Sequence, residues 1–128
     1  MAIIQANDNH PTSRIQRAAR ILAWALAAAI AILSVVPPGL RPETGAPRPL
    51  EHFAIYCATG LAFGLGYRRR HDLFAVFLVM YSGAVETAQL FIPGRHARMS
   101  DFIIDSLAAC FGLLIVTLAS RLRGRDWR

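Results

Sequence analysis

Four long apolar runs, separated by short polar segments, organise this chain. No charged residue falls within residues 21–40, 53–67, 73–85 or 106–120, and nearly all charges lie between these runs. A helix needs about 20 residues, and at least ~17, to cross the hydrocarbon core of a membrane. Each run reaches that length once the polar residues at its ends are included. The pattern predicts an all-α fold: a four-transmembrane-helix bundle with short loops and spans at about residues 21–38, 50–67, 73–91 and 101–119.

A soluble four-helix bundle is the alternative to this membrane interpretation. Its helices would carry polar residues on their outer faces with a period of about 3.6 residues. Residues 23–33 contain only alanine, leucine, isoleucine and tryptophan, so this segment has no polar face at all. The segment therefore favours a membrane span.

The 128 residues leave room for one domain. We expect a flexible N-terminal tail at residues 1–13, the four-helix domain at residues 14–122 and a basic C-terminal tail at residues 123–128. The first run follows three arginines, as in a signal peptide, but it ends without small residues at a cleavage position and is long enough to be retained as a span. Residues 37–49 hold five of the seven prolines, which predicts an extended connector.

Close packing between helices is predicted by small residues in the second and fourth runs. Gly60 and Gly64 lie one helical turn apart, and Ala108, Ala109 and Gly112 make one side of the last run small. Small residues at such spacing let two helices approach closely.

Charge distribution predicts the orientation. All 14 basic residues are arginines, and the net charge is +6. The arginines flank the apolar runs and form no single patch, so we expect no nucleic acid partner. Ten arginines lie in the two tails and the second loop, and four lie in the first and third loops. Basic segments stay in the cytoplasm, which predicts both termini on the cytoplasmic side and the first and third loops outside.

The candidate chemistry lies at the outer ends of the runs. Glu86 and Gln89 share a helix face, as do Asp101 and Asp105, and the turn at Pro93 and Gly94 brings the two faces together. A carboxylate within a span costs about 2.5–3.5 kcal/mol at the centre of the membrane and less near its surface, so Glu86 is by default a functional hypothesis. A structural hydrogen bond to His52 or Arg95 is the alternative role for Glu86.

The other polar residues of this region have two interpretations each. Ser100 can cap the fourth helix with Asp101 in its first turn, whereas Asp105 lies one turn deeper, where capping does not explain it. We expect Arg95 to lie between Glu86 and Asp105, with one proton held by the two carboxyls. Arg95 and Arg98 are either ordinary loop charges, or they neutralise Glu86 and Asp101 or bind an anionic lipid headgroup.

Metal chemistry is not expected from the spacing of the histidines and carboxylates, which matches no metal motif. Cys57 and Cys110 lie inside apolar runs and are interpreted as small buried hydrophobes. We assign no metal site and no cofactor.

With these residues in view, the chain resembles the VanZ-like family of small bacterial membrane proteins between residues 50 and 112. The resemblance rests on several short motifs in a fixed order, namely His52-Phe53 with Tyr56, Glu86-x-x-Gln89, Pro93-Gly94-Arg95, Ser100-Asp101, and Gly112. Two positions depart from the family: an Asp-Lys pair is replaced ahead of His52, and Asp105 stands where asparagine is usual. The resemblance implies a multi-pass protein of the bacterial inner membrane, in a family whose namesake is linked to glycopeptide resistance and whose biochemical activity is generally unassigned.

Our leading hypothesis is a non-enzymatic envelope protein whose outer-face polar pocket binds or senses a lipid or a lipid-linked envelope precursor. The ligand-binding candidates are His52, Tyr56, Glu86, Gln89, Arg95, Ser100, Asp101 and Asp105. A membrane-surface enzyme is the second hypothesis, with Glu86, His52 and Asp105 as acid/base groups, and it lacks a nucleophile motif. A small oligomeric transporter or proton-linked subunit is the third. Membrane lipids are the expected partners, with a homo-oligomer or another membrane protein as further alternatives.

Overall fold

The computed structural model describes residues 11–42 and 44–124 and contains four α-helices. These helices are α1 (Pro11–Val35), α2 (Arg48–Gly66), α3 (His71–Gln89) and α4 (Met99–Leu122), with a short 3-10 helix η1 (Pro38–Leu40) after α1. No strand occurs within the described residues. The predicted all-α fold is therefore confirmed.

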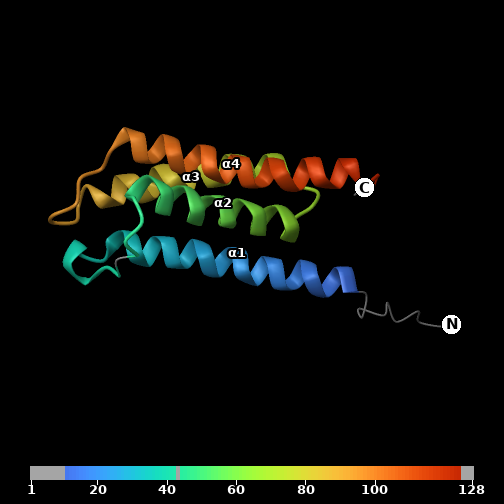
Figure 1. The fold of residues 1–128 in the computed structure, drawn as a ribbon, viewed down its shortest axis with the longest axis horizontal. Coiled ribbons are helices and arrows are strands. Elements are labelled where there is room, and N and C mark those ends of the chain that lie inside the picture. The colour runs from blue at the N-terminus through green and yellow to red at the C-terminus, as the bar shows by residue number, and fades with distance from the viewer. Residues whose placement is uncertain (1–10, 43, 125–128) are drawn as a thin grey trace.

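The helices lie side by side and alternate in direction, so α1 begins and α4 ends at the same end of the bundle (Figure 1). We call this end the terminal end; it also carries the α2–α3 connection. The opposite end carries the long connections α1–α2 and α3–α4, and we call it the loop end. Both segments singled out by the sequence, the proline-rich connector and the Pro93–Gly94 turn, lie at the loop end.

The helix bounds differ most from the predicted spans at the start of α1. This helix begins at Pro11, ten residues before the predicted span, because arginine is a good helix former and continues the helix past the apolar run. The expected tail at residues 1–13 lies outside the described residues up to residue 10, and residues 11–13 begin α1. Residues 125–128 of the expected C-terminal tail also lie outside them.

Helix α2 is central and packs most extensively against α4, then against α1. The reason is the set of small residues at the α2–α4 contact. A Cβ atom on Gly60 would overlap the carbonyl oxygen of Ala109, and one on Gly112 would overlap the carbonyl oxygen of Cys57. The small residues favoured close packing in the sequence, and the structure shows that this packing joins α2 to α4.

Aromatic side chains fill the half of the bundle toward the terminal end. Phe63 is fully buried, with the rings of Trp24, Phe74 and Phe77 centred 5.0–5.7 Å from its own. Arg20 donates to the carbonyl of Gly66 at 2.8 Å and stacks over the ring of Tyr67. These contacts hold α1 against α2 and α3 at the end opposite the candidate site.

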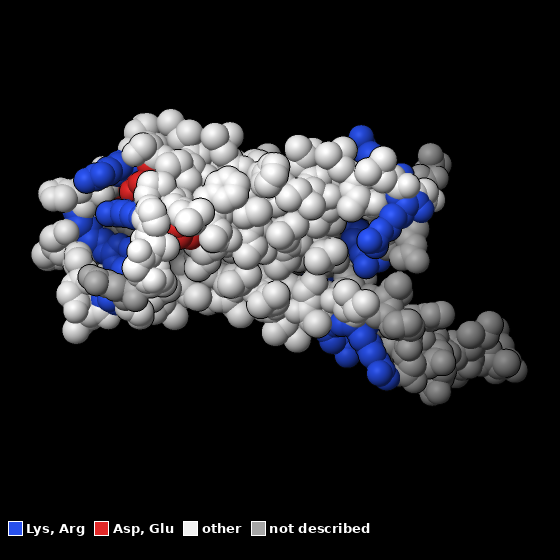
Figure 2. Space-filling model, viewed as in Figure 1, with Lys and Arg blue, Asp and Glu red and all other residues white. Residues whose placement is uncertain are grey.

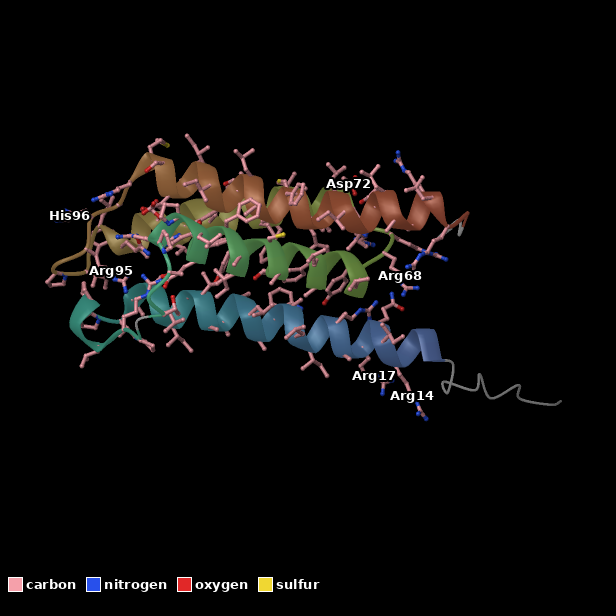
Figure 3. All side chains as sticks on the ribbon, in the orientation of Figure 1. Arg14, Arg17, Arg68, Asp72, Arg95 and His96 are labelled. Carbon is pink, nitrogen blue, oxygen red and sulfur yellow. The ribbon has the colours of Figure 1, made fainter. Side chains whose placement is uncertain are left out.

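The outer surface of the bundle is apolar in its middle and charged at both ends. In Figure 2 the blue side chains, all of them arginines because the chain has no lysine, lie at the two ends. The band between the ends is almost uncharged. Arg14, Arg17 and Arg68 lie at the terminal end, and Arg95 and His96 lie at the loop end (Figure 3). Two helices, over residues 14–35 and 99–122, are long and apolar enough to cross a membrane.

Candidate functional site

Most of the buried polar side chains gather at the loop end of the bundle. Six of the predicted site residues are buried there, and they come from α2, α3 and α4: His52, Tyr56, Glu86, Gln89, Asp101 and Asp105. The helical spacing of Glu86 with Gln89, and of Asp101 with Asp105, places each pair on the inward face of its helix, as the sequence predicted. Ser100 is exposed and does not join this cluster.

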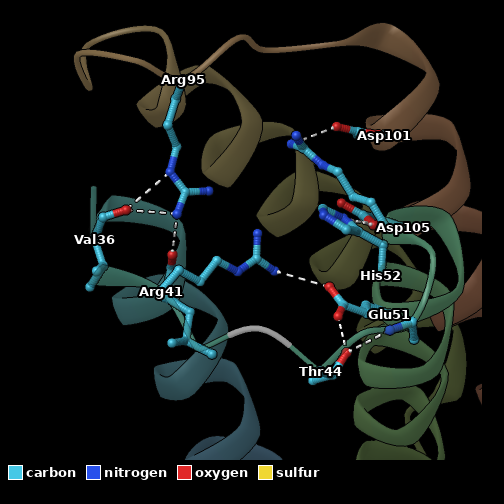
Figure 4. A network of polar contacts seen from close by, with 11 residues as sticks. Val36, Arg41, Thr44, Glu51, His52, Arg95, Asp101 and Asp105 are labelled. Atoms are coloured by element: carbon cyan, nitrogen blue, oxygen red, sulfur yellow. Dashed lines mark hydrogen bonds and ion pairs between the residues drawn. The ribbon is translucent and has the colours of Figure 1, made fainter. Parts of the chain in front are cut away.

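A hydrogen bond and an ion pair join α2 to α4 within the cluster. His52 Nδ1 lies 2.9 Å from Asp105 Oδ1, and the Asp105 side chain is almost completely buried. One turn nearer the loop end, Arg48 Nη2 donates to Asp101 Oδ2 at 3.1 Å (Figure 4). Asp105 is therefore held by His52, and Asp101 by Arg48.

Glu86 caps the start of α4 from the neighbouring helix. Its Oε1 atom accepts a hydrogen bond of 2.7 Å from the backbone N–H of Arg98, the residue that precedes α4. The predicted capping by Ser100 is wrong, because α4 begins at Met99 and has no side-chain cap of its own. A carboxylate at the N-terminus of a helix also interacts favourably with the helix dipole.

Arg95 does not lie between the two carboxyls, and that prediction is wrong. Its guanidinium instead reaches the end of α1, where Nη2 donates to the carbonyls of Leu33 and Val36 at 2.7 Å each and Nε donates to Val36 at 3.1 Å. The last carbonyls of a helix have no partner within the helix. Arg95 therefore fastens the α3–α4 connection to the end of α1.

Burial and the neighbouring positive charges of Arg41 and Arg48 lower the pKa of Arg95 from its ordinary value. A guanidinium remains charged under any physiological condition. The loop end thus holds several positive charges that lie close enough to repel one another. Such an environment favours the binding of an anion.

Several buried polar atoms of the cluster have no hydrogen-bond partner among the described residues. They are His52 Nε2, Tyr56 Oη, Glu86 Oε2 and Gln89 Oε1. His52, Tyr56 and Gln89 also line a small cavity of about 40 Å³, together with Asp105 and Arg95. A cavity of this size holds roughly one to three water molecules, and buried water commonly satisfies such atoms.

A second and larger cavity opens above the cluster, between the two long connections. Its volume is about 410 Å³, and its lining includes Arg41, Arg48, Arg95 and Arg98. Glu51 is the one acidic residue among the described lining residues, and it pairs with Arg41 at 3.9 Å and with the hydroxyl of Thr44. Figure 4 shows the Arg41 side chain extending toward Glu51, whereas the Arg95 guanidinium is turned to the end of α1.

The sequence interpretation missed Arg41, Arg48 and Glu51 as site residues. Arg41 and Arg48 lie within the proline-rich connector and Glu51 follows it, and this connector was interpreted as a spacer. An available signal was the position of Arg48 and Glu51 within one turn of His52, which places all three at the same end of α2.

These features define a class: an all-helical, membrane-associated protein with apolar flanks and a polar, arginine-lined site at one end. The chain belongs to the VanZ/LLP1 family, whose model matches residues 12–120 and so covers nearly all of the described chain. The predicted resemblance to VanZ-like proteins is confirmed. Searches of curated proteins and of solved structures find no match.

Proposed function

We propose that this chain is a multi-pass envelope membrane protein whose outer-face pocket binds a lipid or a lipid-linked envelope precursor. One observation carries the proposal. A cavity of about 410 Å³ lined by four arginines opens at one end of a bundle whose flanks are apolar. Ligand sites for small molecules fall in this size range. A ligand that reaches this cavity from the membrane needs an apolar part for the lipid and a polar part for the arginines, so it is amphipathic.

Exposed apolar side chains on every helix support the membrane location. Large hydrophobic side chains at least 50% exposed occur on α1 (Ile21), α2 (Leu50), α3 (Met80) and α4 (Leu107). Soluble monomers rarely expose such a continuous apolar surface. In a membrane, these side chains contact lipid.

Four spans are supported by where the polar residues of α2 and α3 lie. Each of these helices has 19 residues, which gives a length of about 28 Å, close to the ~30 Å of the hydrocarbon core. Their mean hydropathy is reduced by residues such as His52, Glu86 and Gln89, which are buried inside the bundle. The outer surface that these two helices would present to lipid is therefore more apolar than the average of all their residues.

The arginine distribution supports an orientation with the loop end outside the cytoplasm. In the sequence, ten arginines lie in the two terminal segments and the α2–α3 connection and four in the other two connections, and the more basic side stays inside. Reporter fusions at Gly45 and Arg95 should then be active only outside the cytoplasm, and a fusion at Arg70 only inside. Inverted activity at Arg70 and Arg95 would overturn the outer-face location.

A membrane-surface acid/base enzyme is the second candidate, and one observation favours it. His52 is oriented by Asp105 and leaves Nε2 without a described partner, which is the arrangement of a base and the group that orients it. The cavity beside His52 is only about 40 Å³, so a substrate would have to react from the larger cavity above. We rank binding first for this reason.

Native mass spectrometry of the detergent-purified protein tests the binding proposal. Ala46 lines the arginine-lined cavity, so Ala46→Trp should fill it and reduce the lipid retained from a bacterial membrane extract. Ile32→Trp, at an exposed position on α1, adds the same ring outside the cavity and is the control. Equal lipid retention by wild-type protein and both variants would refute binding in this cavity.

A further inference from the structure

An apolar groove between α3 and α4 lies beside the arginine-lined cavity. It has a volume of about 410 Å³ and is lined by Gly83, Glu86, Thr87, Leu90, Ala97, Arg98, Met99 and Phe102. The α3 part runs from Gly83 to Leu90, which is about 10 Å or two helical turns. Glu86 is itself buried and bonded to the Arg98 backbone, so most of the exposed wall is apolar.

The absence of a side chain at Gly83 helps to form this groove. A Cβ atom there would lie 3.2 Å from the ring of Phe102 on α4, so any larger residue would press against the opposite wall. The groove faces outward between two helices whose flanks carry exposed apolar residues, including Met80 and Leu107. In the proposed membrane location it therefore opens toward lipid chains.

Arg98 lies where the groove and the cavity meet. It lines both spaces, while its backbone N–H is fixed by Glu86. Its guanidinium is on an exposed residue and makes no hydrogen bond or ion pair among the described residues. Arg98 can thus donate to a ligand without breaking a contact that holds the fold.

The cavity side of this junction matches a phosphate group. Arginine binds phosphate through paired N–H donors in a fixed planar arrangement. Arg48 already pairs with Asp101 and Arg95 with the end of α1, so neither needs a ligand for its position. Such pre-positioned positive charges bind an anion without a large ordering cost.

We propose that the ligand is a lipid with a terminal phosphate, its phosphate held by Arg98, Arg41 and Arg48 and its chain lying in the α3–α4 groove. This inference rests on the proposed function and specifies the ligand class of that site. A terminal phosphate carries up to two negative charges and leaves its oxygens open to several arginines. A phosphate esterified to choline carries a compensating positive charge that the arginines repel.

Binding measurements on the full chain in neutral detergent test both halves of the proposal. Native mass spectrometry should give a dissociation constant at least about tenfold lower for dioleoyl phosphatidic acid than for dioleoyl phosphatidylcholine, because hydrogen bonds to a charged group contribute about 1.5–3 kcal/mol. The two lipids have the same chains, so the comparison isolates the headgroup. Competition by inorganic phosphate measures the affinity for the free anion and so distinguishes a lipid site from a free-anion site.

Two variants separate the headgroup site from the chain site. Arg98→Gln should weaken binding of phosphatidic acid about tenfold, whereas Arg17→Gln, an exposed arginine at the terminal end, should not. Thr87→Trp should fill the groove and weaken the binding of phosphatidic acid. It should leave the affinity for inorganic phosphate, measured by competition, unchanged. Leu114→Trp, exposed on the opposite half of α4, is its control.

Each outcome decides between the proposals. Equal affinity for the two lipids would overturn the terminal-phosphate inference and leave the proposed lipid binding intact. Inorganic phosphate binding as tightly as the lipid, with no effect of Thr87→Trp, would overturn the lipid and identify a free-anion site. Loss of binding in the control variants as well, or an altered melting temperature in Arg98→Gln, would assign the effects to folding and refute the site.

Discussion

Gly60→Ala should destabilise the bundle although alanine is the better helix former. Gly60 lies in α2 against the backbone of α4, where a methyl group would overlap the carbonyl oxygen of Ala109 and approach its carbonyl carbon to 2.9 Å. Both atoms belong to a hydrogen-bonded helix and cannot rotate away as a side chain would. The two helices must therefore separate to accommodate the methyl group.

The magnitude follows from two opposing contributions. Inserting a methylene into a close-packed contact costs about 1–3 kcal/mol, and the backbone contact places this change near 3 kcal/mol. Replacing a helical glycine by alanine returns about 1 kcal/mol. The net loss is about 2 kcal/mol, which for a chain of this size corresponds to a fall of roughly 5–10 °C in melting temperature.

Thermal unfolding followed by circular dichroism in detergent measures this effect. Gly39→Ala is the matched control, because a Cβ atom there meets nothing within 4 Å and the backbone φ is ordinary. The control should melt with the wild-type protein. A Gly60→Ala variant as stable as wild type, or more stable, would show that α2 and α4 are not packed backbone to backbone in the membrane protein.

Substitutions at three further positions test the roles assigned at the loop end by the same melting experiment. Glu86→Gln should keep near wild-type stability because its amide oxygen still accepts from the Arg98 N–H, while Glu86→Ala should lose about 1–3 kcal/mol; equal stability of the two would contradict the cap. Arg95→Gln should lose about 1–3 kcal/mol by leaving the last α1 carbonyls without donors, and an unchanged melting temperature would refute that contact. Asp105→Asn should change stability by less than about 1 kcal/mol because the amide oxygen can accept from His52, whereas Asp105→Leu should cost about 1–3 kcal/mol by leaving His52 Nδ1 buried without a partner; a severe loss in Asp105→Asn would mean that the charge itself is required.

The helices and their inward faces were predictable from the sequence because they depend on local patterns. Apolar runs predict the helices, and the glycine and alanine spacing predicts a face for close packing on α2 and on α4. The spacing of Glu86 with Gln89 and of Asp101 with Asp105 also placed these residues on inward faces. Short-range periodicity is enough for each of these conclusions.

The partners within the site were not predictable in the same way. Arg95 was expected near Glu86 because it is close along the chain, but it bonds carbonyls at the end of α1, 59 and 62 positions away. Arg48 and His52 likewise meet Asp101 and Asp105 across 53 positions. A long flexible side chain in a loop can reach several acceptors, and only the three-dimensional arrangement of the helix ends selects among them.

The same helix contact that sets the stability of the bundle also sets the geometry of the site. His52 and Arg48 belong to α2, and their partners Asp105 and Asp101 belong to α4, so the spacing imposed by Gly60 determines whether both pairs can form. The rim of the larger cavity is different, because Arg41 and Arg98 come from the connections and contribute little to helix packing. Substitutions at the helix contact should therefore lower stability and ligand affinity together. Substitutions at the rim should lower affinity alone, and this separation is what a binding site built on a rigid pair of helices requires.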